Sequence, residues 1–159
     1  MTRRVVVTAM SGITAFGTEW NEIQNKLAAK KNAVRYMSEW DYSDDLRTRL
    51  AAPVECYEIP KYPRKKIRSM GRVSLLATGA TEQALESAGL LQHPALTDGS
   101  TGIAYGSSSG SIPPITKIAN LLETGSMKGY TSTTYVELMR STVTVNLKLR
   151  RYFLEVWHQ

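Results

Sequence analysis

Three side chains in the sequence have the chemistry of a nucleophile, a base or a metal ligand: Cys56, His93 and His158. Cys56 lies in "PVECYEIP" with acids on both sides, and neighbouring carboxylates oppose the formation of the reactive thiolate. His93 precedes a proline in a loop-like stretch, His158 is the penultimate residue, and neither has a Cys or His partner at metal-ligand spacing. We therefore interpret Cys56 as structural and predict no catalytic residue, no metal site and no cofactor in this chain.

A glycine- and serine-rich stretch, "TGIAYGSSSGS" at 101–111, could line a binding site. It lacks the Lys-Ser/Thr end of a nucleotide-binding P-loop and the glycine spacing of a dinucleotide fingerprint. The residues predict a strand over 101–106 followed by a loop. A simple strand-to-helix turn is the alternative, and it is compatible with a binding role.

Positive charge gathers in one short segment. The chain has 159 residues and a formal net charge of +6, and the segment 61–72 holds six basic residues and no acid, which equals the whole excess. A compact patch favours a single acidic partner. Nucleic acid is the rival, but a nucleic-acid surface spreads its charge and adds stacking aromatics, whereas only Tyr62 lies within the segment. A solvated turn at the start of a helix remains the alternative without any partner.

The elements that would position these residues alternate between strand and helix, which is typical of an α/β layer architecture. A buried strand is predicted at 3–8, where "RRVVVT" is β-branched, and a helix capped by Thr18 at 19–29. Val54, Cys56 and Ile59 alternate like a short strand. Further along, the pattern predicts one helix from 63 or 64 to 87, the strand at 101–106, a helix running to about Leu122, and a short helix with an irregular turn within 131–146.

Four segments together resemble the N-terminal part of the β-ketoacyl-[acyl-carrier-protein] synthases. They are "RRVVVTAMSGITAFG", "PRKKIRSMGRVSLLATGATEQALESAGL", "TGIAYGSSSGS" and "YVELMRSTVTVN", and the similarity runs from about Thr2 to Asn146. The resemblance implies an α/β chain that is the N-terminal half of a thiolase-like αβαβα layered fold, with a mixed sheet and packed helices. It divides the chain into a half-domain at 1–146 and a divergent tail at 147–159.

Two departures from that family are visible. Ala9 and Ser11 stand where the family usually has glycine, and the chain continues after Asn146 as "LKLRRYFLEVWHQ", which is more charged and bulkier than the family's small apolar helix. The family's nucleophilic cysteine lies just beyond this point, and its histidines and lysine lie in its second half. The resemblance therefore implies a synthase of fatty-acid or polyketide synthesis, present here as a truncated, inactive portion.

The resemblance also assigns binding roles. Ser109 falls where condensing enzymes place a residue at the wall of the acyl pocket. Lys65 and Arg68 match the positions that dock an acidic acyl carrier protein, and Arg64 and Lys66 are neighbours that could assist. A non-enzymatic module that docks a carrier protein or a partner chain is the alternative, as is a synthase completed by a second polypeptide.

The remaining expectations concern surroundings and assembly. No apolar run of about 18 residues is present, so no membrane span is predicted, and the single cysteine favours the reducing cytoplasm. A lone half-domain would leave apolar surface uncovered. We expect the broad apolar stripe of the 64–87 helix and the edge of the strand at 101–106 to make the chain a homo-oligomer.

Overall fold

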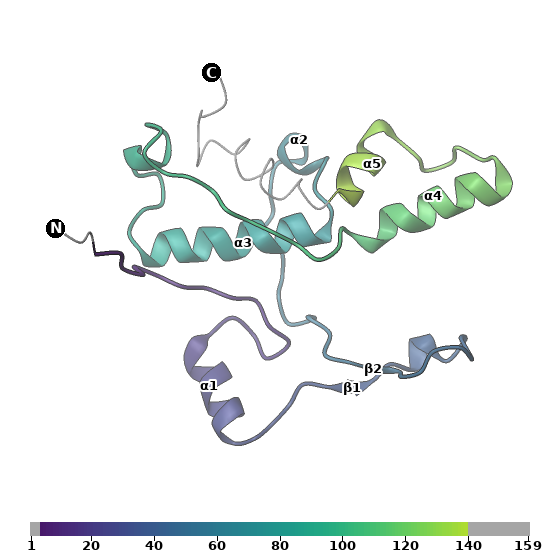
Figure 1. Cartoon of the computed structure of the whole chain (residues 1–159), viewed down its shortest axis with the longest axis horizontal. Coiled ribbons are helices and arrows are strands. Elements are labelled where there is room, and N and C mark those ends of the chain that lie inside the picture. The colour runs from purple at the N-terminus through teal and green to yellow at the C-terminus, as the bar shows by residue number, and fades with distance from the viewer. Residues whose placement is uncertain (1–3, 140–159) are drawn as a thin grey trace. The chain divides into compact units, whose positions relative to one another are not determined.

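The computed structural model describes residues 4–139, which divide into two compact units: Ser11–Glu58, and the flanking residues 4–10 and 59–139. The predicted tail at 147–159 and His158 lie outside the described residues. Helices dominate the described part of the chain, together with one small sheet (Figure 1). Its longest helix has 16 residues, and no helix within 4–139 is both long and apolar enough to cross a membrane.

The Ser11–Glu58 unit contains helix α1, Trp20–Ala28, and an antiparallel pair formed by β1, Arg35–Tyr36, and β2, Leu50–Ala51. Between the strands lies the 3-10 turn η1, Ser38–Trp40. The prediction of a helix over 19–29 is confirmed to within one residue at each end. Its predicted cap is wrong, because the N-cap is Glu19 and the Thr18 hydroxyl contacts the Glu19 side chain instead of a backbone N–H.

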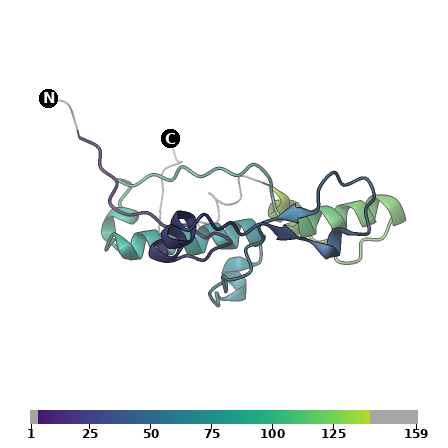
Figure 2. The same cartoon turned by 90° about the horizontal axis from the view of Figure 1, so that it is seen from below.

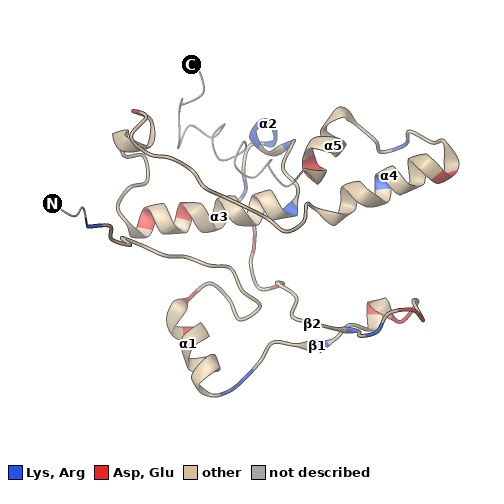
Figure 3. Cartoon of the chain, viewed as in Figure 1, with Lys and Arg blue, Asp and Glu red and all other residues tan. Residues whose placement is uncertain are grey.

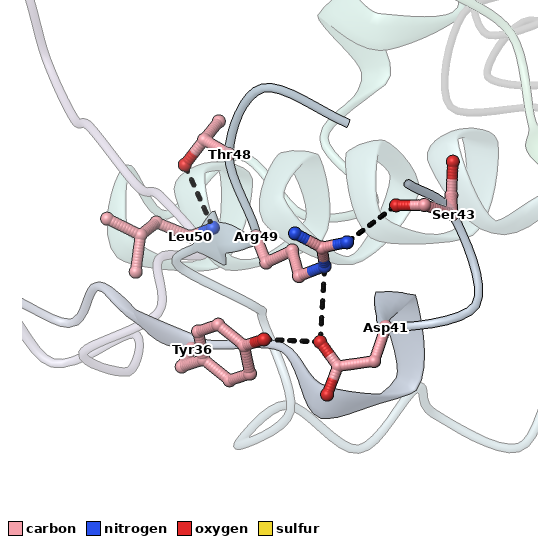
Figure 4. A network of polar contacts seen from close by, with 6 residues as sticks. All are labelled: Tyr36, Asp41, Ser43, Thr48, Arg49 and Leu50. Carbon is pink, nitrogen blue, oxygen red and sulfur yellow. Dashed lines mark hydrogen bonds and ion pairs between the residues drawn. The ribbon is translucent and has the colours of Figure 1, made fainter. Parts of the chain in front are cut away.

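A polar network closes the β1–β2 pair (Figure 4). The Asp41 carboxylate accepts a hydrogen bond from the Tyr36 hydroxyl, and this bond raises the pKa of Tyr36. Arg49 Nε lies 3.1 Å from the same carboxylate and forms an ion pair with it, although the geometry is not that of a hydrogen bond. The Arg49 Nη2 group donates a hydrogen bond to the Ser43 carbonyl at 2.6 Å. The arrangement ties the loop after η1 back to β2, which the irregular sequence of this region did not predict.

The second unit is built around helix α3, Arg72–Ser87, preceded by the single-turn helix α2, Arg64–Ile67. The prediction of one continuous helix over 64–87 is wrong. The break falls at Gly71, whose ψ of 174° is extended and which begins α3 as its N-cap. Glycine loses more backbone entropy in a helix than any other residue, which favours a break at this point.

The rest of this unit follows α3. A 3-10 turn, η2, covers Pro94–Leu96, helix α4 covers Ile112–Thr124, and helix α5 covers Ser132–Leu138 and packs against α4. The predicted helices toward Leu122 and within 131–146 are therefore confirmed, whereas the turn predicted after the latter lies beyond residue 139. A left-handed Gly125 ends α4, and a capping box between Thr131 and Thr134 begins α5.

The three stretches predicted as strands form none within residues 4–139. Val5, Val6 and Val7 are 95%, 66% and 77% exposed, so the prediction of a buried strand there is wrong. A buried strand requires neighbouring strands and a layer on each face, and the described residues supply neither. The 101–106 segment forms no β-ladder with another described segment. It runs over α3 (Figure 1), where Ile103 packs against Val73 and the buried Ala77. The alternation around Cys56 also forms no strand.

Candidate functional site

Helix α2 carries the basic residues that the sequence singled out. Pro63 precedes it as N-cap with φ fixed near the helical value, and the Lys66 amide donates to the Pro63 carbonyl at 2.8 Å. All four candidate side chains are exposed, and none of them forms an ion pair with another described residue; they are Arg64, Lys65, Lys66 and Arg68. Figure 3 shows their charge concentrated on α2 and the start of α3. These four side chains therefore present positive charge to solvent.

Two contacts hold α2 against the longer helix. The Tyr62 hydroxyl donates to the Glu82 carboxylate in α3 at 2.6 Å, and Met70, which is 6% exposed, anchors the turn between the two helices. The Met70 amide donates to the Ile67 carbonyl at 2.8 Å. In Figure 2 the short helix projects from the start of α3, so its cations are presented on a protruding, anchored turn.

The glycine- and serine-rich loop lies at the same end of α3. Ser109 is exposed, and its hydroxyl donates only a long bond of 3.4 Å to the Gly110 carbonyl. The Ser107 hydroxyl donates to the Ser109 carbonyl at 2.5 Å, which turns the backbone of the loop on itself. The Ser109 side chain is thus exposed to solvent, and its place on a pocket wall stays a prediction.

Close packing fixes the end of this loop, at a point that the sequence did not identify. A Cβ on Gly110 would lie 1.8 Å from the Leu138 carbonyl oxygen at the end of α5, and a Cβ on Gly71 would lie 2.1 Å from the Ser111 hydroxyl oxygen. Only hydrogen fits at either position. We call these four residues, Gly71, Gly110, Ser111 and Leu138, the glycine junction. It joins the start of α3, the loop and the end of α5.

Cys56 and His93 each make a local contact of their own. Cys56 is exposed in the other unit, and its thiol donates to the Thr14 carbonyl at 3.5 Å. His93 caps the η2 turn, where its Nδ1 accepts from the Ala95 amide at 3.1 Å. Within 4–139 no three His, Cys, Asp or Glu side chains gather as a metal site would require. The described geometry at one end of α3 is that of exposed cations near a glycine- and serine-rich loop.

Comparison with known proteins gives the family of the chain. The sequence model of the family "Beta-ketoacyl synthase, N-terminal domain" matches residues 2–149, nearly the whole chain. The chain is a member of the β-ketoacyl synthase family.

Solved and curated relatives agree with this assignment. A crystal structure of a β-ketoacyl synthase from Burkholderia phymatum superposes with a TM-score of 0.88 at 49% identity, over 96% of this chain and 38% of that one. "Nodulation protein E" of Rhizobium meliloti is 31% identical over 90 residues, and its namesake from Rhizobium leguminosarum bv. trifolii is 35% identical over 92 residues. Each of these two matches covers 57% of this chain and 22% of the relative.

The structural match confirms the predicted α/β, thiolase-like fold class. The described residues nevertheless form none of the three predicted strands. The chain spans about a fifth of the curated relatives and 38% of the solved synthase. The predicted mixed sheet is likewise not formed within residues 4–139, where the one sheet is the two-stranded β1–β2 pair.

Proposed function

We propose that the chain serves the decarboxylative condensation of acyl groups in fatty-acid or polyketide synthesis, as the N-terminal part of a β-ketoacyl synthase, and that α2 docks an acyl carrier protein. The observation that carries the proposal is the exposed, unpaired charge of α2 in a chain of this family. A carrier protein of acidic surface is the partner that such charge attracts, and attraction of this kind raises the rate of encounter more than the final affinity. The single cysteine supports a cytoplasmic setting.

The condensation needs groups that we do not assign to this chain. A thiolate must accept the acyl chain, and two imidazoles, or an imidazole and an amide, must stabilise the developing negative charge. Cys56 is exposed beside Glu55 and donates its proton to a backbone carbonyl, so it has no base within its described contacts. We propose binding roles only: Ser109 on the wall of the acyl pocket, and Arg64, Lys65, Lys66 and Arg68 on the docking surface.

Reversing two charges of α2 tests the docking. We expect Lys65→Glu with Arg68→Glu to weaken binding to a purified acyl carrier protein at least about tenfold at about 0.05 M salt, because two attractive contacts become repulsive. The difference should shrink at about 0.5 M salt, where the screening length falls to a few ångströms. Isothermal titration calorimetry or surface plasmon resonance measures both affinities.

A control of equal charge separates docking from a general electrostatic effect. Lys31→Glu with Lys128→Glu also reverses two exposed cations, so both variants change the formal net charge from +6 by four units to +2. The control should bind the carrier protein within about twofold of the wild type, since exposed charges outside the proposed docking surface change affinity little. Equal losses in the two variants, or unchanged binding in the Lys65 and Arg68 variant, would contradict docking on α2.

A second candidate function is that of a non-enzymatic module that pairs with another copy of the chain. One face of α4 favours it, because exposed apolar side chains recur there at helical spacing while the opposite face carries the buried Pro114 and packs against α5. The exposed members are Ile112, Ile115, Ala119 and Leu122. Association through the apolar stripe of α3 stays a prediction. The large apolar side chains of α3 are partly covered in the described structure, whereas those of this α4 face are exposed.

We expect the purified chain to be a dimer or larger, and Ile115→Glu with Leu122→Glu to shift it toward monomer by placing charge in the apolar contact. Thr116→Glu with Asn120→Glu, on the polar flank of the same helix, is the matched control and should leave the mass unchanged. Size-exclusion chromatography with light scattering over a concentration series measures the mass. A wild-type monomer at every concentration would exclude pairing through α4.

A further inference from the structure

Helix α3 begins without a cap of its own. Its N-cap is Gly71, which has no side chain to accept a hydrogen bond from the first turn. The Val73 amide, the second of the helix, donates instead to the Ser111 hydroxyl oxygen at 3.3 Å. The cap of α3 is therefore supplied by a residue 38 positions further along the chain.

Ser111 is free to do this because it cannot cap the helix that it precedes. Ser111 is the N-cap residue of α4, and an N-cap side chain normally accepts from the amide at the second or third helical position. In α4 these positions are Pro113 and Pro114, which have no N–H. The side chain makes no cap bond to α4 and turns to α3, where it is buried at 3% exposure.

The same residue ends the loop that carries Ser109. Gly110, between the two serines, lies so close to the Leu138 carbonyl that its backbone position is fixed by the end of α5. The bond from Ser107 to the Ser109 carbonyl holds the loop together internally, but it attaches the loop to no helix. The Ser111 hydroxyl attaches the end of the loop to α3.

We propose that Ser111 is a positioning residue whose hydroxyl fixes the 107–110 loop, and hence Ser109, on the first turn of α3. The hydroxyl is available for this because Pro113 and Pro114 offer it no N–H in α4. The role of Ser109 on a pocket wall rests on the proposed function, whereas the attachment does not. Ser111 itself faces no ligand, and it acts only through the position of its neighbours.

A nitroxide probe at residue 109 tests the attachment in the full 159-residue chain. Cys56→Ser removes the only natural cysteine, and Ser109→Cys provides the labelling site. In this background, Ser111→Ala should increase the mobility of the label seen by electron paramagnetic resonance. In the chain without the label, Ser111→Ala should speed hydrogen exchange of the Val73 amide about fivefold, the loss expected for one hydrogen bond.

The matched control removes another buried hydroxyl, one that lies within α3 itself. Thr78 is fully buried and donates to the Ser74 carbonyl at 2.8 Å, one turn away from the loop contact. Thr78→Ala should leave the label immobile and the Val73 amide protected. Equal label mobility in both variants, or an unchanged label in Ser111→Ala, would overturn the proposal, since a general loss of stability would move both alike. The measurement uses neither carrier protein nor acyl ligand, so its failure is distinct from failure of the docking test.

Discussion

Replacing Gly110 by alanine is expected to lower the free energy of unfolding by about 3 kcal/mol, the upper part of the usual range for forcing a methyl group into a packed site. The added Cβ would lie 1.8 Å from the Leu138 carbonyl oxygen and 2.7 Å from its carbon. Both are backbone atoms at the end of α5, so no side chain can rotate away. Relief requires the loop or α5 to move, and thermal or urea unfolding followed by circular dichroism measures the cost.

Gly106→Ala is the control for this substitution. Gly106 lies four residues earlier in the same stretch, is exposed, and has nothing within 4 Å of the position that a Cβ would take. We expect a change within about 0.5 kcal/mol, as for other surface substitutions that create no clash. Equal stability of the two variants would show that the contact between Gly110 and Leu138 is not maintained in solution.

Gly71→Ala is the second substitution with a large expected effect, a loss of about 2 kcal/mol. The backbone of Gly71, with φ of −78°, is accessible to alanine, so the cost comes from packing alone. The new Cβ would lie 2.1 Å from the Ser111 hydroxyl oxygen and 2.5 Å from the Ser111 Cβ. The clash displaces the hydroxyl that caps α3, and stability and capping are therefore lost together.

A double-mutant cycle identifies Ser111 as the cause. Ser111→Gly removes both atoms that meet the new Cβ, at the cost of about 1 kcal/mol for the lost cap. The next nearest atom, the Glu137 carbonyl oxygen, lies 3.2 Å from the Cβ position, which a small shift accommodates. We expect the double variant to lose about 1 kcal/mol less than the sum of the single losses. Strict additivity of the two losses would contradict a direct clash between residues 71 and 111.

Local sequence signals predicted the helices well because each depends on near neighbours. The apolar spacing of Trp20, Ile23 and Leu27 defined α1 to within one residue at each end, and the stretch before Leu122 gave α4. The apolar periodicity of 64–87 continues across Gly71, and it therefore predicted one helix where the structure has two. A glycine flanked by good helix formers carries no local sign that another segment packs against it.

Strands were predicted less well because their formation depends on partners. "RRVVVT" has the composition of a buried strand, yet within residues 4–139 it has no sheet to enter and its valines are exposed. The short β1–β2 pair formed instead where no alternation was visible, held by Asp41 and Arg49. Composition predicts what a segment can do, and the presence of neighbouring strands decides whether it does so.

For the candidate site, the sequence located the charge but not the packing. The exposed cations of α2 could be predicted because an acid-free basic segment has nothing nearby to neutralise it. The glycine junction could not, since it joins segments that are distant in sequence. One signal was available: the prolines two and three residues after Ser111 leave that serine without a donor at the usual capping positions of its own helix, which indicates a partner elsewhere.

The borrowed cap of α3 has a consequence for the order of events during synthesis. At about 5–20 residues per second, Ser111 leaves the ribosome about 2 to 8 s after Val73, because the two are 38 residues apart. During that interval the first turn of α3 has neither a cap of its own nor the one supplied later, and only water satisfies its amides. The nascent helix is thus frayed at the end that adjoins the basic segment until the serine-rich loop emerges. Completion of the α3 N-terminus is a late step of folding, timed by translation of the loop.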